Sequence, residues 1–215
     1  MIDPFDYKEP QCPLCGGEEF YGAERRARSV PIMNITEKLD SFFSKEDYRG
    51  AKKLLEYWLT EAREIGDERG ELSLLSEVMG LSRRIGEHEW GMDAVHRGTE
   101  LCRSLGLAES VSGATVLLNA ATTMKAFGEA EASIPYYEDV RGVYEKYLDP
   151  DDARFGGLYN NMALALADCG RYGEAEDAYE KALVVMSSKK NGALESAITL
   201  INMAELYERA LGDSE

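Results

Sequence analysis

The segment GRYGEAEDAYEKAL, residues 170–183, decides the fold of this chain. Gly170 marks a turn, and the Ala- and Glu-rich residues after it favour a helix. Ala175, Tyr179 and Ala182 are spaced by four and then three residues, so they lie on one face of that helix. The alanine allows a second helix to approach closely, and the tyrosine fills the adjoining gap. The segment therefore predicts a short turn followed by a helix that packs against its neighbour.

The same pattern recurs along the chain, which is the signature of a repeat architecture. Glycines at positions 86, 128, 170 and 212 are each 42 residues apart. A small residue recurs after the turns, at Ala51, Gly91, Ser133 and Ala175. A larger apolar residue comes four positions later, at Leu55, Val95, Tyr137 and Tyr179. From residue 34 onward, the sequence therefore predicts successive units of helix, short turn and helix.

The segment at 170–183 resembles the second half of a tetratricopeptide repeat. The resemblance covers roughly residues 34–215 and is strongest at 153–186, although the interval is longer than the usual length of that repeat. It implies an all-α fold, a right-handed α-α superhelix of about four and a half helix pairs. We therefore expect an irregular N-terminal segment at 1–31 and a tetratricopeptide-like repeat domain at 32–215, whose last repeat is incomplete.

Composition limits the possible partners. Lys plus Arg is 24 against 40 for Asp plus Glu, which gives a net charge of −16. Nucleic acid and anionic membranes need a positive surface, so we expect neither as a partner. No apolar run reaches the roughly 18 residues of a membrane span, and MIDPFDYKEP lacks the features of a signal peptide. Four cysteines without an export signal indicate a reducing, cytoplasmic location.

The first helices of three successive pairs each carry a predicted packing stripe. The stripes are Leu117, Ala121 and Met124, then Tyr159, Ala163 and Leu166, then Leu200, Ala204 and Tyr207. An asparagine precedes the alanine of each stripe by two residues, about 200° around the helix. Asn119, Asn161 and Asn202 are therefore expected on the side opposite to the packing faces.

The family resemblance gives these asparagines a function. In such superhelices the first helices line the concave surface, and peptide receptors of the family use asparagines at this place to hold the backbone of an extended ligand. An amide side chain carries a donor and an acceptor, so it can pair with both groups of one peptide unit. We predict a ladder of Asn119, Asn161 and Asn202 that binds a peptide. The alternative is that they are only soluble residues on an exposed face.

Further residues share the groove side of the predicted ladder. The candidates for ligand contact are Thr115, Thr122, Leu164 and Asp168. Glu77 takes the place of the asparagine in the preceding repeat, so the ladder ends there. Asn160 corresponds to Leu118 and Ile201, neither of which is polar, and is interpreted as a groove-edge or solvated residue.

Three basic residues fall on the groove-side turns of the second and third repeats. They are Arg83, Arg84 and Lys125. Against the negative charge of the chain they could receive a carboxylate, such as the C-terminus of a peptide. Ordinary basic surface residues explain them equally well.

The N-terminal segment contains QCPLCGG, starting at Gln11, which resembles the metal-binding knuckle of zinc ribbons and rubredoxins. Cys12 and Cys15 supply two of the four ligands that zinc prefers. Cys102, His88, His96 or a second chain would have to complete the site, and otherwise no cofactor is expected. We also expect the aromatic residues of this segment to pack onto the first helix pair.

The sequence gives no positive sign of catalysis. His88 and His96 are eight residues apart rather than four, and no phosphate-binding glycine loop or nucleophile motif is present. The predicted function is a non-catalytic scaffold that binds an extended protein or peptide segment in its concave groove. Two alternatives stay open: a self-assembling structural scaffold, which requires a homo-oligomer, and the repeat region of a longer regulatory protein.

Overall fold

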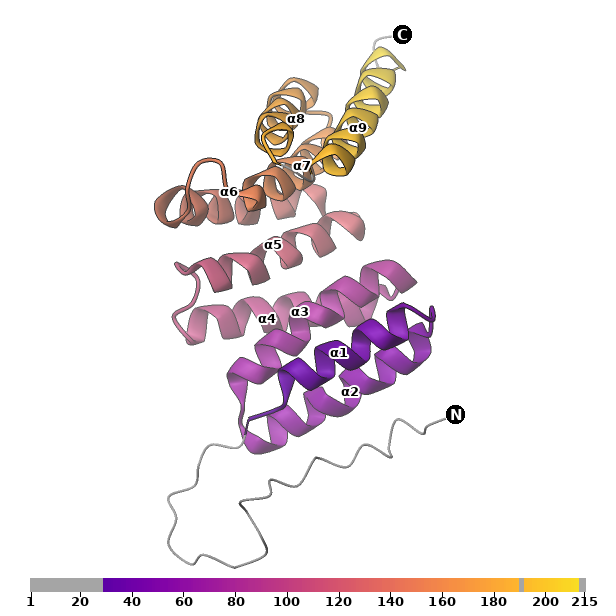
Figure 1. Cartoon of the computed structure of the whole chain (residues 1–215), viewed down its shortest axis with the longest axis vertical. Coiled ribbons are helices and arrows are strands. Elements are labelled where there is room, and N and C mark those ends of the chain that lie inside the picture. The colour runs from indigo at the N-terminus through magenta and orange to yellow at the C-terminus, as the bar shows by residue number, and fades with distance from the viewer. Residues whose placement is uncertain (1–28, 190–191, 213–215) are drawn as a thin grey trace, which may run out of the picture.

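A computed structural model describes residues 29–189 and 192–212, and every regular element in these ranges is an α-helix. The helices stack along the long axis of the molecule (Figure 1). They are α1 (Ile32–Phe43), α2 (Tyr48–Ile65), α3 (Glu68–Ile85), α4 (His88–Ser104), α5 (Val111–Ala126), α6 (Ala130–Tyr147), α7 (Ala153–Asp168), α8 (Tyr172–Ser187) and α9 (Ala193–Gly212). The predictions for Cys12, Cys15 and the packing of the N-terminal aromatic residues lie outside the described residues.

The boundaries of the helices follow from local sequence. Gly66, Gly86 and Gly170 adopt left-handed φ values of 72°, 73° and 70°, which residues with a Cβ rarely tolerate. Asp67 then begins α3, because its carboxylate accepts a hydrogen bond of 2.9 Å from the Gly70 amide. Such turns, only a few residues long, fold successive helices back on one another as pairs.

The pairs form a superhelix with an inner and an outer layer. Each odd-numbered helix contacts the next odd-numbered helix, whereas within the described residues successive even-numbered helices do not contact each other. The odd-numbered helices are therefore closer together and form the inner, concave side. This arrangement confirms the predicted fold and places the first helix of each pair along the groove.

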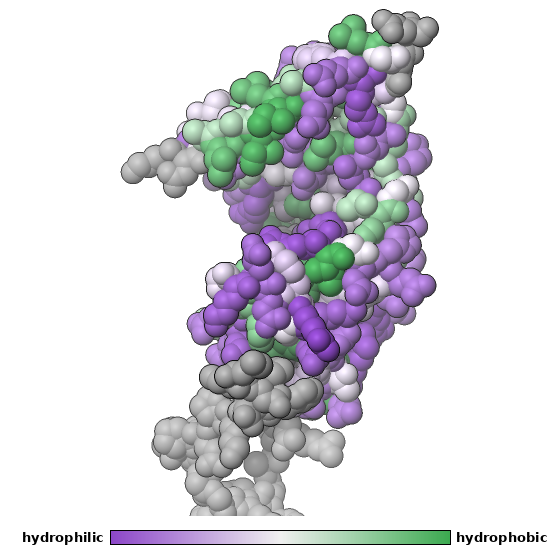
Figure 2. Space-filling model, turned by 90° about the vertical axis from the view of Figure 1, so that its right-hand side faces the viewer, coloured by the Kyte–Doolittle hydropathy of each residue, from purple (hydrophilic) through white to green (hydrophobic). Residues whose placement is uncertain are grey.

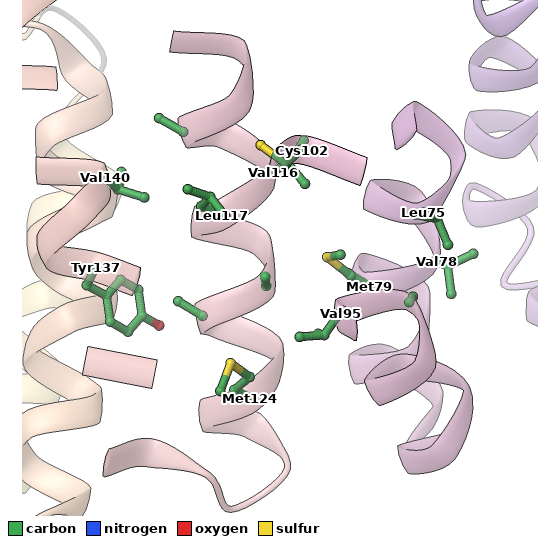
Figure 3. Close-up of a cluster of buried hydrophobic side chains, with 14 of the residues drawn as sticks. Leu75, Val78, Met79, Val95, Cys102, Val116, Leu117, Met124, Tyr137 and Val140 are labelled. Carbon is green, nitrogen blue, oxygen red and sulfur yellow. The ribbon is translucent and has the colours of Figure 1, made fainter. Parts of the chain in front are cut away.

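The recurring positions in the sequence build the core. Tyr137 and Tyr179 are fully buried, as the pattern of small and large residues predicts. At Gly91 an added Cβ would come within 2.6 Å of the Phe127 ring, so only glycine allows this close approach of helices. Figure 3 shows the apolar side chains of α3, α4, α5 and α6 interlocking in one continuous cluster. The repeat spacing therefore predicts which residues hold neighbouring pairs together.

The prediction of a packing stripe is wrong for α9. Leu200 and Tyr207 are 55% and 45% exposed, whereas the equivalent Leu117 and Leu166 of α5 and α7 are 5% and 2% exposed. The difference arises because α6 covers α5 and α8 covers α7, while no helix in the described part of the chain covers this face of α9. The helix instead buries Thr199 and Leu206.

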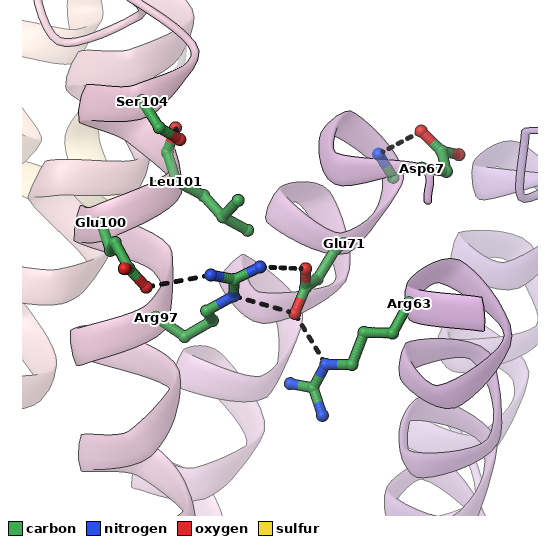
Figure 4. Close-up of polar contacts among 8 residues, drawn as sticks. Arg63, Asp67, Glu71, Arg97, Glu100, Leu101 and Ser104 are labelled. Atoms are coloured by element: carbon green, nitrogen blue, oxygen red, sulfur yellow. Dashed lines mark hydrogen bonds and ion pairs between the residues drawn. The ribbon is translucent and has the colours of Figure 1, made fainter. Parts of the chain in front are cut away.

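A buried carboxylate links the first two pairs. Glu71 in α3 lies between Arg63 of α2 and Arg97 of α4, and both guanidinium groups point at it (Figure 4). The Nε of Arg63 is 2.7 Å from its Oε1, and the Nη2 of Arg97 is 3.0 Å from its Oε2. Burial opposes the ionisation of Glu71, but the hydrogen bonds and charges of the two arginines outweigh it and lower its pKa. The cluster therefore ties three helices together through one ionised side chain.

Candidate functional site

The three asparagines of the predicted ladder lie on inner helices α5, α7 and α9, and each is half-buried. Equivalent positions in neighbouring inner helices face one another with an offset of one residue. Asn119 in α5 donates a hydrogen bond of 2.7 Å from Nδ2 to Oγ of Ser76 in α3. Asn202 in α9 donates one of 3.1 Å from Nδ2 to Oδ1 of Asn160 in α7. Ser76 and Asn160 occupy the same place in their repeats, so the two bonds are equivalent.

Asn161 differs from the other two asparagines. The same offset places it opposite Leu118 of α5, which offers no hydrogen-bonding side chain. Among the described residues, the Asn161 amide has no side-chain partner. Both its donor and its acceptor therefore remain available on the concave side.

Asn160 holds two helices together rather than standing solvated at the edge of the groove. Its Oδ1 accepts hydrogen bonds from Asn202 and, at 3.2 Å, from the Thr199 hydroxyl of α9. The two adjacent asparagines of α7 thus face different ways. Asn160 bonds to α9, and Asn161 leaves its amide unpaired.

Tyr179 is a further member of the site, which the sequence pattern assigned only to packing. Its ring is buried in α8, and its pKa is raised to about 12 by burial and then by the charge of Glu205, with Asp168 and Arg209 also acting on it. These three residues lie on α7 and α9, so the hydroxyl reaches the region between the two helices. Among the described residues the hydroxyl has no hydrogen-bond partner.

The repeat equivalent of Tyr179 explains why its hydroxyl is unpaired. Tyr137 in α6 donates to the Thr122 hydroxyl at 3.4 Å. Leu164 takes the place of Thr122 in the next repeat and provides no acceptor. Comparing these two pairs of positions in the sequence would have identified Tyr179 as a candidate.

The predicted threonines are partly used within the protein. Thr115 and Thr122 donate to the carbonyl oxygens of Val111 and Leu118 at 3.1 and 2.8 Å, one turn earlier in α5. Because each hydroxyl proton is already donated, these hydroxyls can only accept a hydrogen bond from a ligand, through their remaining lone pairs. The threonines therefore contribute shape and acceptors to the groove more than donors.

The basic residues of the groove already have partners. Arg83 donates from Nη1 to Oγ1 of Thr123 at 2.7 Å and to the Asn119 carbonyl at 3.3 Å, and burial lowers its pKa. The guanidinium of Arg84 lies 5.6 and 5.8 Å from the ring centroids of Phe43 and Tyr48. Both arginines therefore connect helices of the solenoid.

Asp168 is the centre of an ionic chain along the end of the groove. Its carboxylate lies 3.1 Å from Nζ of Lys125 in α5 and 3.0 Å from Nη1 of Arg209 in α9. The carboxylate and the two cations come from three successive inner helices. These contacts pair the charges of Lys125, Asp168 and Arg209 with one another, whereas burial and then the charge of Asp40 raise the pKa of Glu77, which takes the asparagine position in α3.

Comparison with known proteins agrees with this geometry. Residues 155–215 match the model of the tetratricopeptide repeat family. Over most of the chain, the structure is similar to that of BtubC (BKLC) from P. vanneervenii, with a TM-score of 0.71, 22% identity, and coverage of 83% of this chain and 72% of that one. The fold is a tetratricopeptide-type solenoid.

A second similar structure contains nearly identical TPR-like repeats of a Podosopora anserina protein described as a kinesin light chain. The TM-score is 0.70 at 14% identity, and the match covers 83% of this chain and 86% of that one. A substituted form of the same protein matches with a TM-score of 0.71, 14% identity and coverage of 83% and 85%. At these identities the likeness concerns the fold alone. Among curated proteins, none matches the sequence.

The solenoid offers no metal site within its described part, where no three histidine, cysteine or acidic side chains gather closely enough to hold an ion. Cys102 is buried 3.8 Å from the Gly113 carbonyl, and burial raises the pKa of its thiol. The ring of His88 packs against Phe127, with 5.1 Å between centroids. Both residues thus serve packing. In the same part of the chain, no helix combines the length and the apolar character needed to cross a membrane.

Proposed function

We propose that this solenoid is a non-catalytic scaffold that holds an extended protein segment on its concave side, with a main-chain amide of the segment paired to Asn161. The observation that carries the proposal is the free amide of Asn161 on the concave side. Tetratricopeptide solenoids generally serve as protein-interaction scaffolds, and this supports the general class. Cys102 and Cys169 are free thiols, which suits a reducing cytoplasm as the location.

The asparagine ladder keeps one complete binding position and two partial ones. Asn161 can offer both a donor and an acceptor to a peptide unit. Asn119 and Asn202 each donate one side-chain N–H to the neighbouring helix but retain the side-chain oxygen Oδ1 as an acceptor. The hydroxyl of Tyr179, whose ring is held rigidly by burial, adds a further unpaired group between α7 and α9. A ligand that pairs with these groups therefore satisfies polar atoms that the protein leaves unpaired.

The electrostatics of the groove favour recognition of the main chain. Lys125 and Arg209 are paired with Asp168, while Arg83 and Arg84 contact neighbouring helices. A ligand carboxylate at these cations would have to compete with existing contacts. Around these cations the groove therefore suits an uncharged part of a segment, and a terminal carboxylate at Arg83, Arg84 or Lys125 would have to displace one of these contacts.

Apolar contacts must supply most of the affinity. A neutral hydrogen bond contributes about 0.5–1.5 kcal/mol, so two bonds to Asn161 give roughly 1–3 kcal/mol. This is enough to set the direction and register of a backbone but too little for tight binding. Leu164, half-buried one turn after Asn161 in α7, and Ile198, exposed on α9, are the expected side-chain contacts.

The test uses a linear peptide selected on the intact chain from a library of random peptides. We expect Asn161→Ala to weaken the synthesised peptide about tenfold, since each factor of ten corresponds to about 1.4 kcal/mol. Thr60→Ala, on the exposed side of α2, is the control and should leave the affinity unchanged. Equal affinity for wild type and Asn161→Ala, or no selected peptide that competes for the groove, would refute the proposal.

A further inference from the structure

Few large apolar side chains are exposed outside α9, and two of them line grooves on the outer side of the solenoid. Figure 2 looks onto the side that lies at the right of Figure 1, where polar residues cover most of the surface and apolar ones gather toward the C-terminal end. Among the described residues outside α9, the exposed ones are Met33, Tyr57, Tyr147 and Val184. Tyr147 lines a groove beside α6, and Val184 lines one beside α8.

The two grooves are built from equivalent positions of successive repeats. The groove beside α6, which we name the α6 groove, also borders the loop between α4 and α5 and has a volume of about 440 Å³. The groove beside α8 has a volume of about 500 Å³. The inner helices contribute Leu117 to the first and Tyr159, 42 residues later, to the second. At the same interval, Glu138, Asp139, Gly142 and Val143 of α6 correspond to Glu180, Lys181, Val184 and Val185 of α8.

Differences between the two repeats make the α6 groove emptier and more acidic. Gly142 takes the place of Val184, and a Cβ added at Gly142 would meet no atom within 4 Å. In the groove beside α8, the ammonium of Lys181 lies 5.9 Å from the centroid of the Tyr159 ring, so this groove contains a cation of its own. Asp139 takes the place of Lys181 in the α6 groove. A carboxylate therefore stands where the other groove has an ammonium.

The charges of the α6 groove are unbalanced. Its lining includes three carboxylates and one ammonium, from Glu109, Glu138, Asp139 and Lys146. The ammonium of Lys146 lies 3.9 Å from Glu109, and Glu138 forms an ion pair with Arg141. Asp139 is exposed, and its carboxylate has no hydrogen-bond or ion-pair partner among the described residues. The groove therefore offers one unpaired negative charge.

Apolar surface lies beside this carboxylate. Leu117 and Val143 line the groove and are 5% and 8% exposed. The missing side chain of Gly142 leaves space next to them on α6. Long basic side chains pack an apolar stem against such a surface while their charged head stays near water. The arrangement thus fits a side chain with an apolar stem and a cationic end.

We propose that the α6 groove receives a lysine or arginine side chain from a basic segment of another protein. The stem packs on Leu117 and Val143 through the space left by Gly142, and the cationic head pairs with Asp139. The partner thereby supplies the cation that Lys181 supplies in the next repeat.

The position and charge of the α6 groove narrow the choice of occupant. Helix pairs are present on both sides of it, α3 with α4 and α7 with α8, so its exposure is not that of an end of the stack. A second copy of this chain is disfavoured, because each copy has a net charge of −16 and the lining of the groove is itself acidic. The proposal concerns the outer side and does not depend on the function of Asn161.

The probes are short peptides of glycine and serine with a single central lysine or arginine. A peptide with central norleucine keeps the apolar stem without the charge, and one with central glutamate reverses the charge. Each peptide is titrated into the isotope-labelled intact chain. NMR follows the amide of Gly142 and the methyl groups of Leu117 and Val143, because these signals report on the α6 groove rather than on general attraction to an acidic protein.

We expect the lysine and arginine peptides to bind with a Kd of about 1–10 mM, at least fivefold more tightly than the two controls, with a difference that shrinks as salt is added. Asp139→Asn should weaken them at least fivefold, whereas Glu37→Gln, which removes an equal charge from the exposed surface of α1, should not. Gly142→Val should block the groove. Gly173→Val is its control, because an added Cβ there also meets open space. Circular dichroism checks that all four variants keep their helices.

Three results would overturn the proposal. One is the absence of any saturable shift in the groove signals up to about 20 mM peptide. Another is equal binding of the lysine and norleucine peptides, or equal binding of the lysine peptide to wild type and to Asp139→Asn. The third is a chain mass that light scattering finds doubled and that Gly142→Val returns to a single chain, which would assign the α6 groove to a second copy.

Discussion

The junction between α3 and α5 differs from the junction between α5 and α7, although both place an asparagine in the same position. At the first, Asn119 meets Ser76, and Arg83 adds bonds to Thr123 and to the Asn119 carbonyl. At the second, Asn161 meets Leu118, and Lys125–Asp168 is the polar contact that joins the two helices in the described part of the chain. Asparagine thus links two repeats where the facing residue of the preceding inner helix offers an acceptor, and its amide stays unpaired where that facing residue is apolar.

This difference shows that a recurring residue need not have a recurring function. A side chain at this position lies between the groove and the preceding repeat. If the preceding repeat offers a hydrogen-bonding partner, fewer polar atoms of the side chain remain available to a ligand in the groove. At the N-terminal junctions Asn119 and Ser76 bond to each other, and Glu71 lies between Arg63 and Arg97. The pairs from α7 onward leave Asn161 and Tyr179 unpaired, and this is the region where ligand binding is expected.

The largest effect on stability is expected at Glu71, which links α3 to α2 and α4. Removing one partner of a buried ion pair costs about 3–5 kcal/mol. Because Arg63 and Arg97 are partly exposed and can regain water, we expect the lower end, about 3 kcal/mol, for Glu71→Gln in chemical denaturation. Glu100→Gln removes an exposed partner of Arg97 and should cost less than about 1 kcal/mol. Similar losses for both variants would mean that the cluster does not hold the first pairs together.

The same residue predicts a pH dependence. The arginines lower the folded-state pKa of Glu71 below its ordinary value of 4.5, so its contribution is complete above that pH and is lost as the pH falls through the folded-state value. We therefore expect the stability difference between wild type and Glu71→Gln to shrink below pH 4.5. A difference that is constant down to pH 3 would contradict an ionised Glu71.

The next effect separates the asparagines from one another. Asn119→Ala breaks the bond to Ser76 and should lower the free energy of unfolding by about 1 kcal/mol, less the helix preference of alanine. Asn161→Ala breaks no bond within the protein and should raise stability by several tenths of a kcal/mol. The measurement is thermal or urea unfolding of the two single variants. Equal losses would show that Asn161 also links repeats.

The sequence predicted the fold well because the fold depends on spacing. Small and large residues at fixed intervals determine which helix faces can meet, and the interval of 42 residues shows how many pairs follow. The stripe of α9 was predicted wrongly for a physical reason. A periodic apolar face is buried only if another helix covers it, and the periodicity of α9 does not say whether one does.

The site was harder to predict because it depends on contacts between repeats. The sequence placed Asn161 and Leu164 on the groove side, but the pairing of Asn119 with Ser76 and of Asn202 with Asn160 requires the offset between neighbouring helices. Tyr179 was recognised as a packing residue by its ring. Its free hydroxyl depends on the replacement of Thr122 by Leu164 in the neighbouring helix, which an analysis of single positions overlooks.

The smallest expected effect on stability comes from Leu118→Asn, which makes the second junction resemble the first. The new amide would lie opposite Asn161 as Asn160 lies opposite Asn202. Leu118 is half-buried, so its loss costs about 1 kcal/mol of apolar burial, and one hydrogen bond to Asn161 returns about the same amount.

Leu118→Ala is the matched control, because it removes the same side chain without providing an acceptor. We expect little net change in melting temperature for Leu118→Asn, but a several-fold loss of affinity for the selected peptide, since one N–H of Asn161 would then be bonded to α5. Leu118→Ala should show the opposite pattern, with lower stability and a smaller loss of affinity. If the two variants weaken the peptide equally, Leu118 itself contacts the ligand, and the availability of Asn161 does not depend on the residue that faces it.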